Sequence, residues 1–226
     1  MGIDKNSFKH VVYQEIAKTV SAVADPRRLE IVELLAQCER NVETLAAMLG
    51  SGVTATSHHL QVLKQARLVT SRKAGRYVYY SVTDMALSLW NSLSELASTE
   101  SAVVKCAVEE LFGGDELEAE ALDYEELQRR IQNGQAVLID VRPKEEFATA
   151  HVPGALSISL EELDARLGEL PRDTPVFAYC RDRYCVLSQE ATELLSEKGY
   201  TARRLPEGIA EWRAAGLPLE SLSQSK

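Results

Sequence analysis

The N-terminal half of the chain shows hydrophobic positions at helical spacing. An apolar stripe through residues 8–23 predicts a first helix, and Asp25-Pro26 then reads as an N-cap followed by proline at the first helical position. Residues 42–49 predict a short helix, and after a brief turn residues 54–65 predict the next. Two short helices joined by a turn indicate a helix-turn-helix.

The pattern changes to a period of two after these helices. Residues 68–82 alternate in this way around Lys73-Ala74-Gly75-Arg76, which is typical of a β-hairpin. Asp84 then caps a long predicted helix that runs to about Phe112, with a break expected near residues 98–101. A helix-turn-helix followed by a hairpin describes a winged helix.

The remainder of the chain alternates strands and helices. Apolar runs of buried-strand length occupy 136–139 and 175–179, a helix is predicted over 186–198, and 202–205 predicts a third strand. We therefore expect two domains: an α+β, mostly α winged helix over residues 1–112, an acidic linker over 113–121, and an α/β domain with a mainly parallel sheet over 122–226.

Composition places the chain among ordinary globular proteins. Its 226 residues suit two domains, and 45% are hydrophobic and 26% charged. The N-terminus does not resemble a signal peptide and no long apolar run occurs, so we expect a cytoplasmic protein with no membrane partner. Four cysteines are too few for a disulfide scaffold, and we expect thiols kept for chemistry: Cys38, Cys106, Cys180 and Cys185.

Charge is distributed unevenly along the chain. The net charge is −9, but residues 1–100 hold 11 Lys/Arg against 10 Asp/Glu, whereas residues 101–226 hold 14 against 24. A locally basic strip without an acidic residue lies in the first part, as phosphate contact requires. Its members are Lys64, Arg67, Arg72, Lys73 and Arg76.

The helix over 54–65 has the two faces of a DNA-reading helix. Leucines at positions 60, 63 and 68 are expected to point inward, and short or hydrogen-bonding side chains recur on the opposite side. The predicted DNA-binding residues are Thr54, Ser57, His58 and Gln61 on this helix and Arg72, Lys73 and Arg76 on the hairpin. The alternative is a helical hairpin with an ordinary polar face. Adjacent His58 and His59 point in different directions on a helix, so we favour DNA contact or core packing over a metal.

Three segments of this half resemble the ArsR family of dimeric repressors: ADPRRLEIVELL, TSHHLQVLKQARLV and RKAGRYVYYSVTD. The resemblance covers roughly residues 10–112 and implies a homodimer on a double-stranded DNA operator, joined through the first and last helices. The apolar residues that fit this interface are Leu89, Trp90, Leu93, Leu96, Val104 and Val108. Metal-sensing members carry cysteines where this chain has 41–45, or His after Asp84, so we expect neither a metal nor another cofactor.

Cys180 follows an apolar strand and precedes a helix. A loop in this position turns its backbone N–H groups toward one point, and the helix N-terminus adds positive potential. Arg181 and Arg183 stand beside the thiol, which favours a thiolate near neutral pH that also accommodates an attached sulfur anion. The alternative is a buried, inert cysteine at a strand end.

Residues 122–220 resemble rhodanese domains in the segments LIDVRPKEEFATAHVPGALSISLEEL, AYCRDRYC and LPEGIAEWRAAGLPLE. The resemblance implies that Cys180 accepts sulfane sulfur as a persulfide and passes it to a thiol acceptor. Four further residues would support the site, with the first two structural or facing the substrate and the last two structural: Asp140, Arg142, Glu146 and His151.

The loop from Cys180 to Cys185 has the six-residue length associated with sulfur-transferring rhodaneses. A phosphatase loop would need arginine where Val186 stands, which argues against phosphate or arsenate ester chemistry. The loop departs from the family pattern, and Asp182 is expected to offset part of the arginine charge. Cys185 either resolves a Cys180 persulfide into a disulfide or is a small apolar residue leading into the helix, and we slightly favour the second.

Together these features predict a DNA-binding regulator, acting as a repressor, that responds to reactive sulfur or redox state. Its partners would be operator DNA, a second copy of the chain, and small sulfur donors and thiol acceptors. Cys38 and Cys106 are either receiving thiols or packing residues. The alternatives are a sulfurtransferase that uses the helical half for dimerisation, and a metalloid-responsive repressor, which would need three converging thiols.

Overall fold

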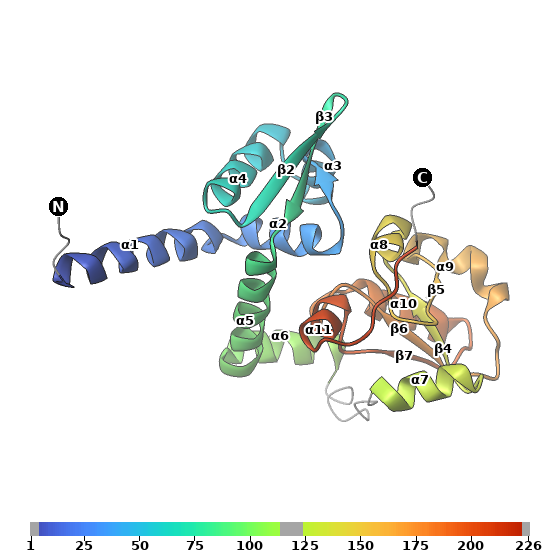
Figure 1. Ribbon diagram of the computed structural model, residues 1–226. Coiled ribbons are helices and arrows are strands. Elements are labelled where there is room, and N and C mark those ends of the chain that lie inside the picture. Colours follow the sequence, from blue (N-terminus) through green and yellow to red (C-terminus); the bar gives the residue numbers. More distant parts are fainter. Residues whose placement is uncertain (1–4, 114–123, 223–226) are drawn as a thin grey trace. The chain divides into compact units, whose positions relative to one another are not determined.

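A computed structural model describes residues 5–113 and 124–222 (Figure 1). The chain divides into two compact units, Met1–Ser92 and Leu93–Lys226. Most of the predicted acidic linker lies outside the described residues, and the domain bounds expected from the sequence stay a prediction. No helix in the described part of the chain is long and apolar enough to cross a membrane.

The first unit is built from helices and one small sheet. Local signals start its helices: the Asp25 side chain accepts a hydrogen bond from Arg28 N, and that of Asn41 accepts one from Thr44 N. The elements are α1 (Lys5–Val23), α2 (Pro26–Gln37), β1 (Arg40–Asn41), α3 (Val42–Met48), α4 (Val53–Gln65), β2 (Val69–Ala74), β3 (Tyr77–Val82) and the first part of α5 (Asp84–Glu100).

The sheet of the first unit is antiparallel, in the order β1-β3-β2. Its hairpin closes at the pair Ala74 and Tyr77, and Gly75 takes the left-handed conformation (φ 60°) that the two-residue turn requires. Figure 1 shows the hairpin extending beyond the helices of this unit. The predicted hairpin is confirmed, whereas the two-residue strand β1 has no counterpart in the sequence pattern.

The helix predicted to follow the hairpin is interrupted where its sequence indicated. α5 ends at Glu100 and α6 (Ala102–Phe112) begins after Ser101, whose side chain accepts a hydrogen bond from Val104 N. A serine N-cap satisfies a backbone donor that the first turn of a helix leaves unpaired, so it starts a new helix. The expected break is therefore confirmed.

The second unit is built around a parallel four-stranded sheet in the order β5-β4-β6-β7. Parallel strands need crossover connections, and helices supply them here. The elements after α6 are α7 (Tyr124–Gln132), β4 (Val137–Asp140), α8 (Lys144–Thr149), β5 (Leu156–Ser157), α9 (Leu160–Arg166), a 3-10 turn (Leu167–Glu169), β6 (Val176–Tyr179), α10 (Leu187–Glu197), β7 (Ala202–Arg204) and α11 (Ile209–Ala214).

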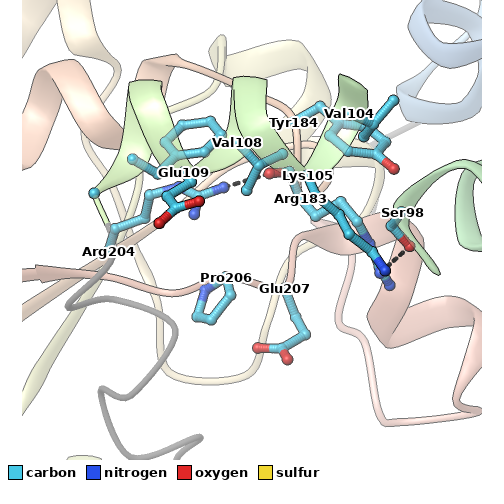
Figure 2. A pocket seen from close by; sticks show the side chains of 12 residues that line it. Ser98, Val104, Lys105, Val108, Glu109, Arg183, Tyr184, Arg204, Pro206 and Glu207 are labelled. Carbon is cyan, nitrogen blue, oxygen red and sulfur yellow. Dashed lines mark hydrogen bonds between the residues drawn. The ribbon is translucent and has the colours of Figure 1, made fainter. Parts of the chain in front are cut away.

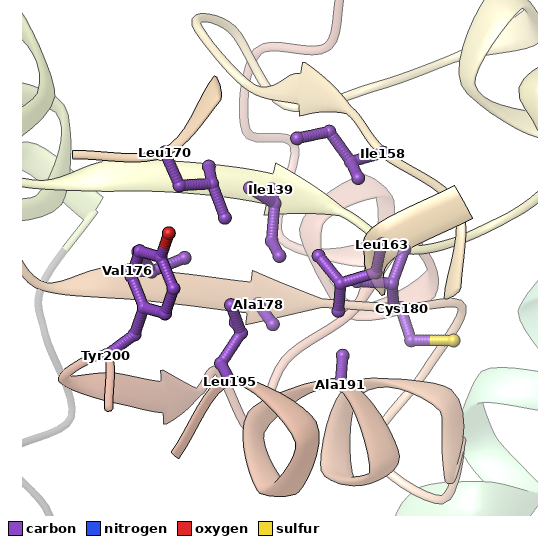
Figure 3. Packing of buried hydrophobic residues seen from close by; sticks show 11 residues of the cluster. Ile139, Ile158, Leu163, Leu170, Val176, Ala178, Cys180, Ala191, Leu195 and Tyr200 are labelled. Carbon is purple, nitrogen blue, oxygen red and sulfur yellow. The ribbon is translucent and has the colours of Figure 1, made fainter. Parts of the chain in front are cut away.

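Both faces of this sheet are buried, which explains why its central strands are apolar without alternation. Ile139 and Ala178 face one core with α9 and α10, and Leu138 and Phe177 face another with α7 and α11. Cys180 belongs to the first core, and Figure 3 shows its sulfur directed away from the packed side chains. The predicted α/β domain with a parallel sheet is confirmed.

Candidate functional site

Helix α4 has the two faces that the sequence predicts. Leu60, Leu63 and Leu68 are fully buried and anchor the helix and the chain that follows it. Thr54, His58 and Gln61 are exposed and Ser57 is half-buried, so the four predicted DNA-reading residues share the accessible side. Their contact with DNA stays a prediction.

The hairpin presents Arg72, Lys73 and Arg76 to solvent. Arg72 also forms a salt bridge with Glu39, with Nε 2.8 Å from Oε2, and this pair lowers the pKa of Glu39. An exposed pair of this kind is weak and can exchange for a phosphate. This pair is not predictable from the sequence, because the two residues lie far apart along the chain.

The end of α4 is tied to the start of α5 through one threonine. Thr83 Oγ1 lies 3.0 Å from Leu68 O and 3.3 Å from Arg67 O, and Ala86 N donates to the same hydroxyl oxygen. Arg67 has a left-handed backbone (φ 59°), which turns the chain from α4 into the hairpin. A shift at the start of α5 would therefore reach the segment that directly follows the predicted recognition helix.

The two adjacent histidines diverge, as expected. The rings of His58 and His59 are inclined at 74° with centroids 6.1 Å apart, and His59 Nδ1 lies 3.8 Å from Asp25 Oδ1. Within 5–113 and 124–222, no group of three His, Cys, Asp or Glu side chains comes together as a metal site.

Cys180 lies directly after β6, at the carboxyl edge of the sheet, and is 1% exposed. It forms a disulfide with Cys185, and their Cα atoms are 6.1 Å apart. Cys185 also packs against the first core. The slight preference for a merely apolar Cys185 is therefore wrong, because its sulfur is bonded to the predicted reactive sulfur. Spacing alone left both outcomes open.

The loop closed by this disulfide uses its own backbone donors. Tyr184 N donates to Asp182 Oδ1 at 2.9 Å, Cys185 N to Asp182 O at 3.2 Å, and Arg183 N to Glu211 Oε1 at 3.3 Å. We expected N–H groups converging on an anion held by Cys180. In the disulfide form, three of these donors are instead directed to acceptors that the chain provides.

Each arginine of the loop is paired with a glutamate. Arg181 binds the buried Glu146 through two nitrogens, with Nη2 2.8 Å from Oε1, and Arg183 Nε lies 3.2 Å from Glu211 Oε1. The positive charge expected from Arg181 and Arg183 beside Cys180 is therefore paired with carboxylates. With Arg204, which donates to Arg183 O, three guanidiniums face the three carboxylates of Glu146, Asp182 and Glu211, so these side chains sum to zero.

Asp182 is the buried acid of the loop, with 5% of its surface exposed. Burial, together with the neighbouring charge of Glu211, raises its pKa to about 6. The hydrogen bond from Tyr184 N and the charge of Arg181 act in the opposite direction but do not cancel the rise. The carboxylate is thus held at a cost in free energy above pH 6.

Gly208 and Glu211 were not among the predicted site residues. Glu211 Oε2 accepts a hydrogen bond from Gly208 N at 2.9 Å, while Oε1 serves Arg183. A Cβ on Gly208 would lie 2.4 Å from Asp182 N and 2.5 Å from Arg181 C, so only glycine permits this approach. A glutamate three residues after a helix-capping position was the signal that could have found the pair.

The four predicted supporting residues are all buried, and two of them share a hydrogen-bonded network. Arg142 Nε donates to Asp140 Oδ1 at 2.9 Å, and Tyr179 OH donates to Asp140 Oδ2 at 2.6 Å. Asp140 and Arg142 are fully buried, which supports a structural role for both. His151 stacks on Phe147 with centroids 3.8 Å apart, which supports a structural role for it as well. Glu146 is also fully buried and holds Arg181, which fits the structural role expected of it.

Two residues of the loop also contact α5, and all partners lie in the second unit. Tyr184 OH donates to Ser94 O at 2.9 Å, and Arg183 Nη1 donates to Ser98 Oγ at 3.2 Å. Figure 2 shows the second bond beside a cavity of about 590 Å³ that α6 borders. Arg204 donates to Arg183 O and stacks over the Phe112 ring at 3.9 Å.

The remaining cysteines are separate thiols. Cys38 is the half-buried C-cap of α2, and Cys106 is exposed on α6. Their predicted sensing role stays a prediction. Of the residues expected at a dimer interface, Leu96 is 58% exposed and the rest are half-buried, with Val104 and Val108 lining the cavity. α1 also exposes apolar side chains: Phe8, Val11, Val12, Tyr13, Ile16 and Val20.

Comparison with known families matches both halves. Residues 25–71 match the arsR family of bacterial regulatory proteins, and residues 123–215 match the rhodanese-like domain. The chain is 38% identical over 213 residues to the HTH-type transcriptional regulator Rv0324 of Mycobacterium tuberculosis, covering 94% of this chain and 93% of that protein. It is also 33% identical to a sulfurtransferase of Allochromatium vinosum, over 43% of this chain and 92% of that one.

Among solved structures, the homodimeric winged helix-turn-helix DNA-binding domain of a possible ArsR-family regulator from Mycobacterium bovis aligns with a TM-score of 0.41. The alignment has 32% sequence identity and covers 45% of this chain and 93% of that domain.

Proposed function

Because this chain belongs to the ArsR-family transcriptional regulators that carry a rhodanese-like domain, we propose that it is a repressor whose DNA affinity follows the state of the Cys180–Cys185 pair. One observation carries the proposal. Arg183 and Tyr184 lie between the bonded cysteines, and their side chains hold α5. Opening or closing the disulfide changes the loop that bears both contacts.

In the proposed sulfur chemistry, the two cysteines react one after the other. With the pair reduced, the Cys180 thiolate attacks the outer sulfur of a hydropersulfide RSSH, and RS⁻ leaves as Cys180–SSH forms. The Cys185 thiolate then attacks Cys180 Sγ, which closes the disulfide and expels HS⁻. A dithiol reductant reopens the disulfide by exchange and becomes a disulfide itself. The structure has the closed form.

The route from the loop to DNA contact is short. α5 runs without interruption from Asp84 to the turns that carry Ser94 and Ser98. Directly before its start, Thr83 bonds to the carbonyl oxygens of Arg67 and Leu68, which directly follow α4. If the loop no longer bonds to Ser94 and Ser98, α5 loses these two contacts and can shift. Such a shift would be transmitted to the predicted recognition helix α4. This route needs no sulfur transfer to Cys38 or Cys106.

The partners follow from the same assignment. The exposed face of α4 and the basic hairpin bind duplex DNA, and the apolar residues of α1 and α5 pair with a second copy of the chain. A hydropersulfide donor and a dithiol reductant act at the loop.

The test measures DNA affinity against thiol state in the full chain. A duplex is first selected by the reduced protein from a random pool, and its Kd is then measured by fluorescence anisotropy at fixed salt for the reduced and disulfide forms. We expect the two Kd values to differ about fivefold or more, as in known allosteric couplings. Equal Kd values would refute the proposed regulation, and multiple-turnover sulfur transfer with equal Kd values would establish a sulfurtransferase instead.

One variant and two controls locate the coupling. Tyr184→Phe removes the bond to Ser94 O and should bring the two Kd values together. Tyr200→Phe is the matched control, because it removes a tyrosine bond to the backbone carbonyl of Leu167 elsewhere in the same unit. The control should keep the redox difference. A Cys38→Ser, Cys106→Ser double variant should keep it as well.

A further inference from the structure

The loop between Cys180 and Cys185 contains its own anion. Asp182 is nearly fully buried, and its carboxylate accepts the Tyr184 N–H at 2.9 Å. Cys185 N–H donates to the main-chain oxygen of Asp182 at 3.2 Å. Converging backbone N–H groups in a loop form an anion-binding site. Here the carboxylate of Asp182, a residue of the loop itself, is the anion at this site, in the place that an anionic sulfur carried by Cys180 would otherwise take.

The arginines of the loop do not offset this charge. Glu146 holds Arg181 and Glu211 holds Arg183, and with Arg204 at Arg183 O these side chains sum to zero, so no excess positive charge faces an anion at Cys180 beside the Asp182 carboxylate. A like charge at close range disfavours the arrival of another anion, and low exposure strengthens the effect. The penalty grows with the charge of the sulfur donor.

We propose that Asp182 determines donor specificity at Cys180, which takes sulfur from organic hydropersulfides and rejects doubly charged thiosulfate. The inference rests on the proposed persulfide chemistry. A hydropersulfide brings at most one negative charge and leaves as a thiolate. Thiosulfate brings two, and transfer of its outer sulfur to the Cys180 thiolate releases sulfite, again a dianion, past the same carboxylate.

The experiment compares the two donors on reduced full-length protein carrying Cys185→Ser, which prevents disulfide closure. Loading of Cys180 is followed over time as the mass of one added sulfur, with thiosulfate or an alkyl hydropersulfide as the donor. Asp182→Asn keeps an acceptor for Tyr184 N and removes the charge. We expect it to raise the thiosulfate rate about tenfold relative to the hydropersulfide rate.

The control is Asp173→Asn, which removes the same charge from an exposed position in the same unit. It should leave the ratio of the two rates unchanged. Asp182→Ser repeats the test with a smaller side chain, should the asparagine variant fold poorly. A merely structural role of Asp182 would change both donor rates together, so the ratio separates charge from folding.

The outcomes distinguish the two levels of the proposal. Loading by both donors with the same rate ratio in the Cys185→Ser parent and both Asp182 variants overturns the specificity role and leaves the persulfide chemistry standing. No loading of Cys180 by either donor in any variant overturns the proposed function and this inference together. A further measurement is the rate of Cys180 alkylation as a function of pH. The midpoint of this curve should lie at a lower pH in Asp182→Asn than in the parent.

Discussion

Removing the charge of Asp182 should stabilise the second unit, and the size of the effect follows from its pKa. Burial and Glu211 raise that pKa from 3.8 to about 6. A carboxyl with a raised pKa in the folded state binds its proton more tightly there than in the unfolded chain. Its contribution to stability is therefore present at low pH and is lost as the pH rises from about 4 to about 6.

The loss amounts to about 3 kcal/mol, because each pKa unit corresponds to about 1.4 kcal/mol. The asparagine of Asp182→Asn does not titrate, so the variant should not lose this stability as the pH rises. The free energy of unfolding of the variant minus that of the parent should therefore be larger at pH 7 than at pH 4, by up to about 3 kcal/mol. The asparagine oxygen can still accept the Tyr184 N–H.

The assay is urea unfolding without reductant at pH 4, 5, 6 and 7, in protein that carries Trp90→Phe. The chain has two tryptophans, so fluorescence then reports on Trp212, which is buried in the second unit. Asp173→Asn, at an exposed position, should run parallel to the parent. If the Asp182→Asn curve also runs parallel to the parent between pH 4 and pH 7, Asp182 has no raised pKa and the reasoning fails.

Three further predictions concern other parts of the chain. Gly208→Ala should lower the urea midpoint reported by Trp212, because the added methyl meets backbone atoms, whereas Gly168→Ala, with nothing within 4 Å, should not. Leu63→Ala should destabilise the first unit by about 2–5 kcal/mol in circular-dichroism melts, since the side chain is fully buried; an unchanged melt would contradict that packing. Lys73→Gln should reduce the slope of log Kd against log salt by about 1, and an unaltered slope would show that this lysine does not contact phosphate.

The parts of the fold that were predictable depend on neighbours in sequence. Asp25 and Ser101 cap their helices through residues three positions away, and the Gly75 turn is set by its own backbone freedom. The apolar strand before Cys180 is likewise a local pattern. Each of these signals lies within a few consecutive residues, so the sequence alone predicts the helix starts, the turn and the strand.

The electrostatic character of the site was not predictable, because its determining pairs are distant in sequence. Arg181 meets a glutamate 35 positions earlier, and Arg183 meets one 28 positions later. Counted locally, two arginines beside a cysteine indicate a positive site. Only the folded chain adds the carboxylates that neutralise these arginines.

The bond from Tyr184 to α5 ends on the main-chain oxygen of Ser94. Every amino acid at position 94 offers that oxygen, so a mutational scan would find this position tolerant of polar replacements. Loss of the bond would be seen only in substitutions of Tyr184. For the same reason, the residue types at positions 94 and 184 should not covary, although the two positions are hydrogen-bonded. Genetic screens for constitutive or blocked regulation should therefore yield changes at residue 184 without partners at residue 94.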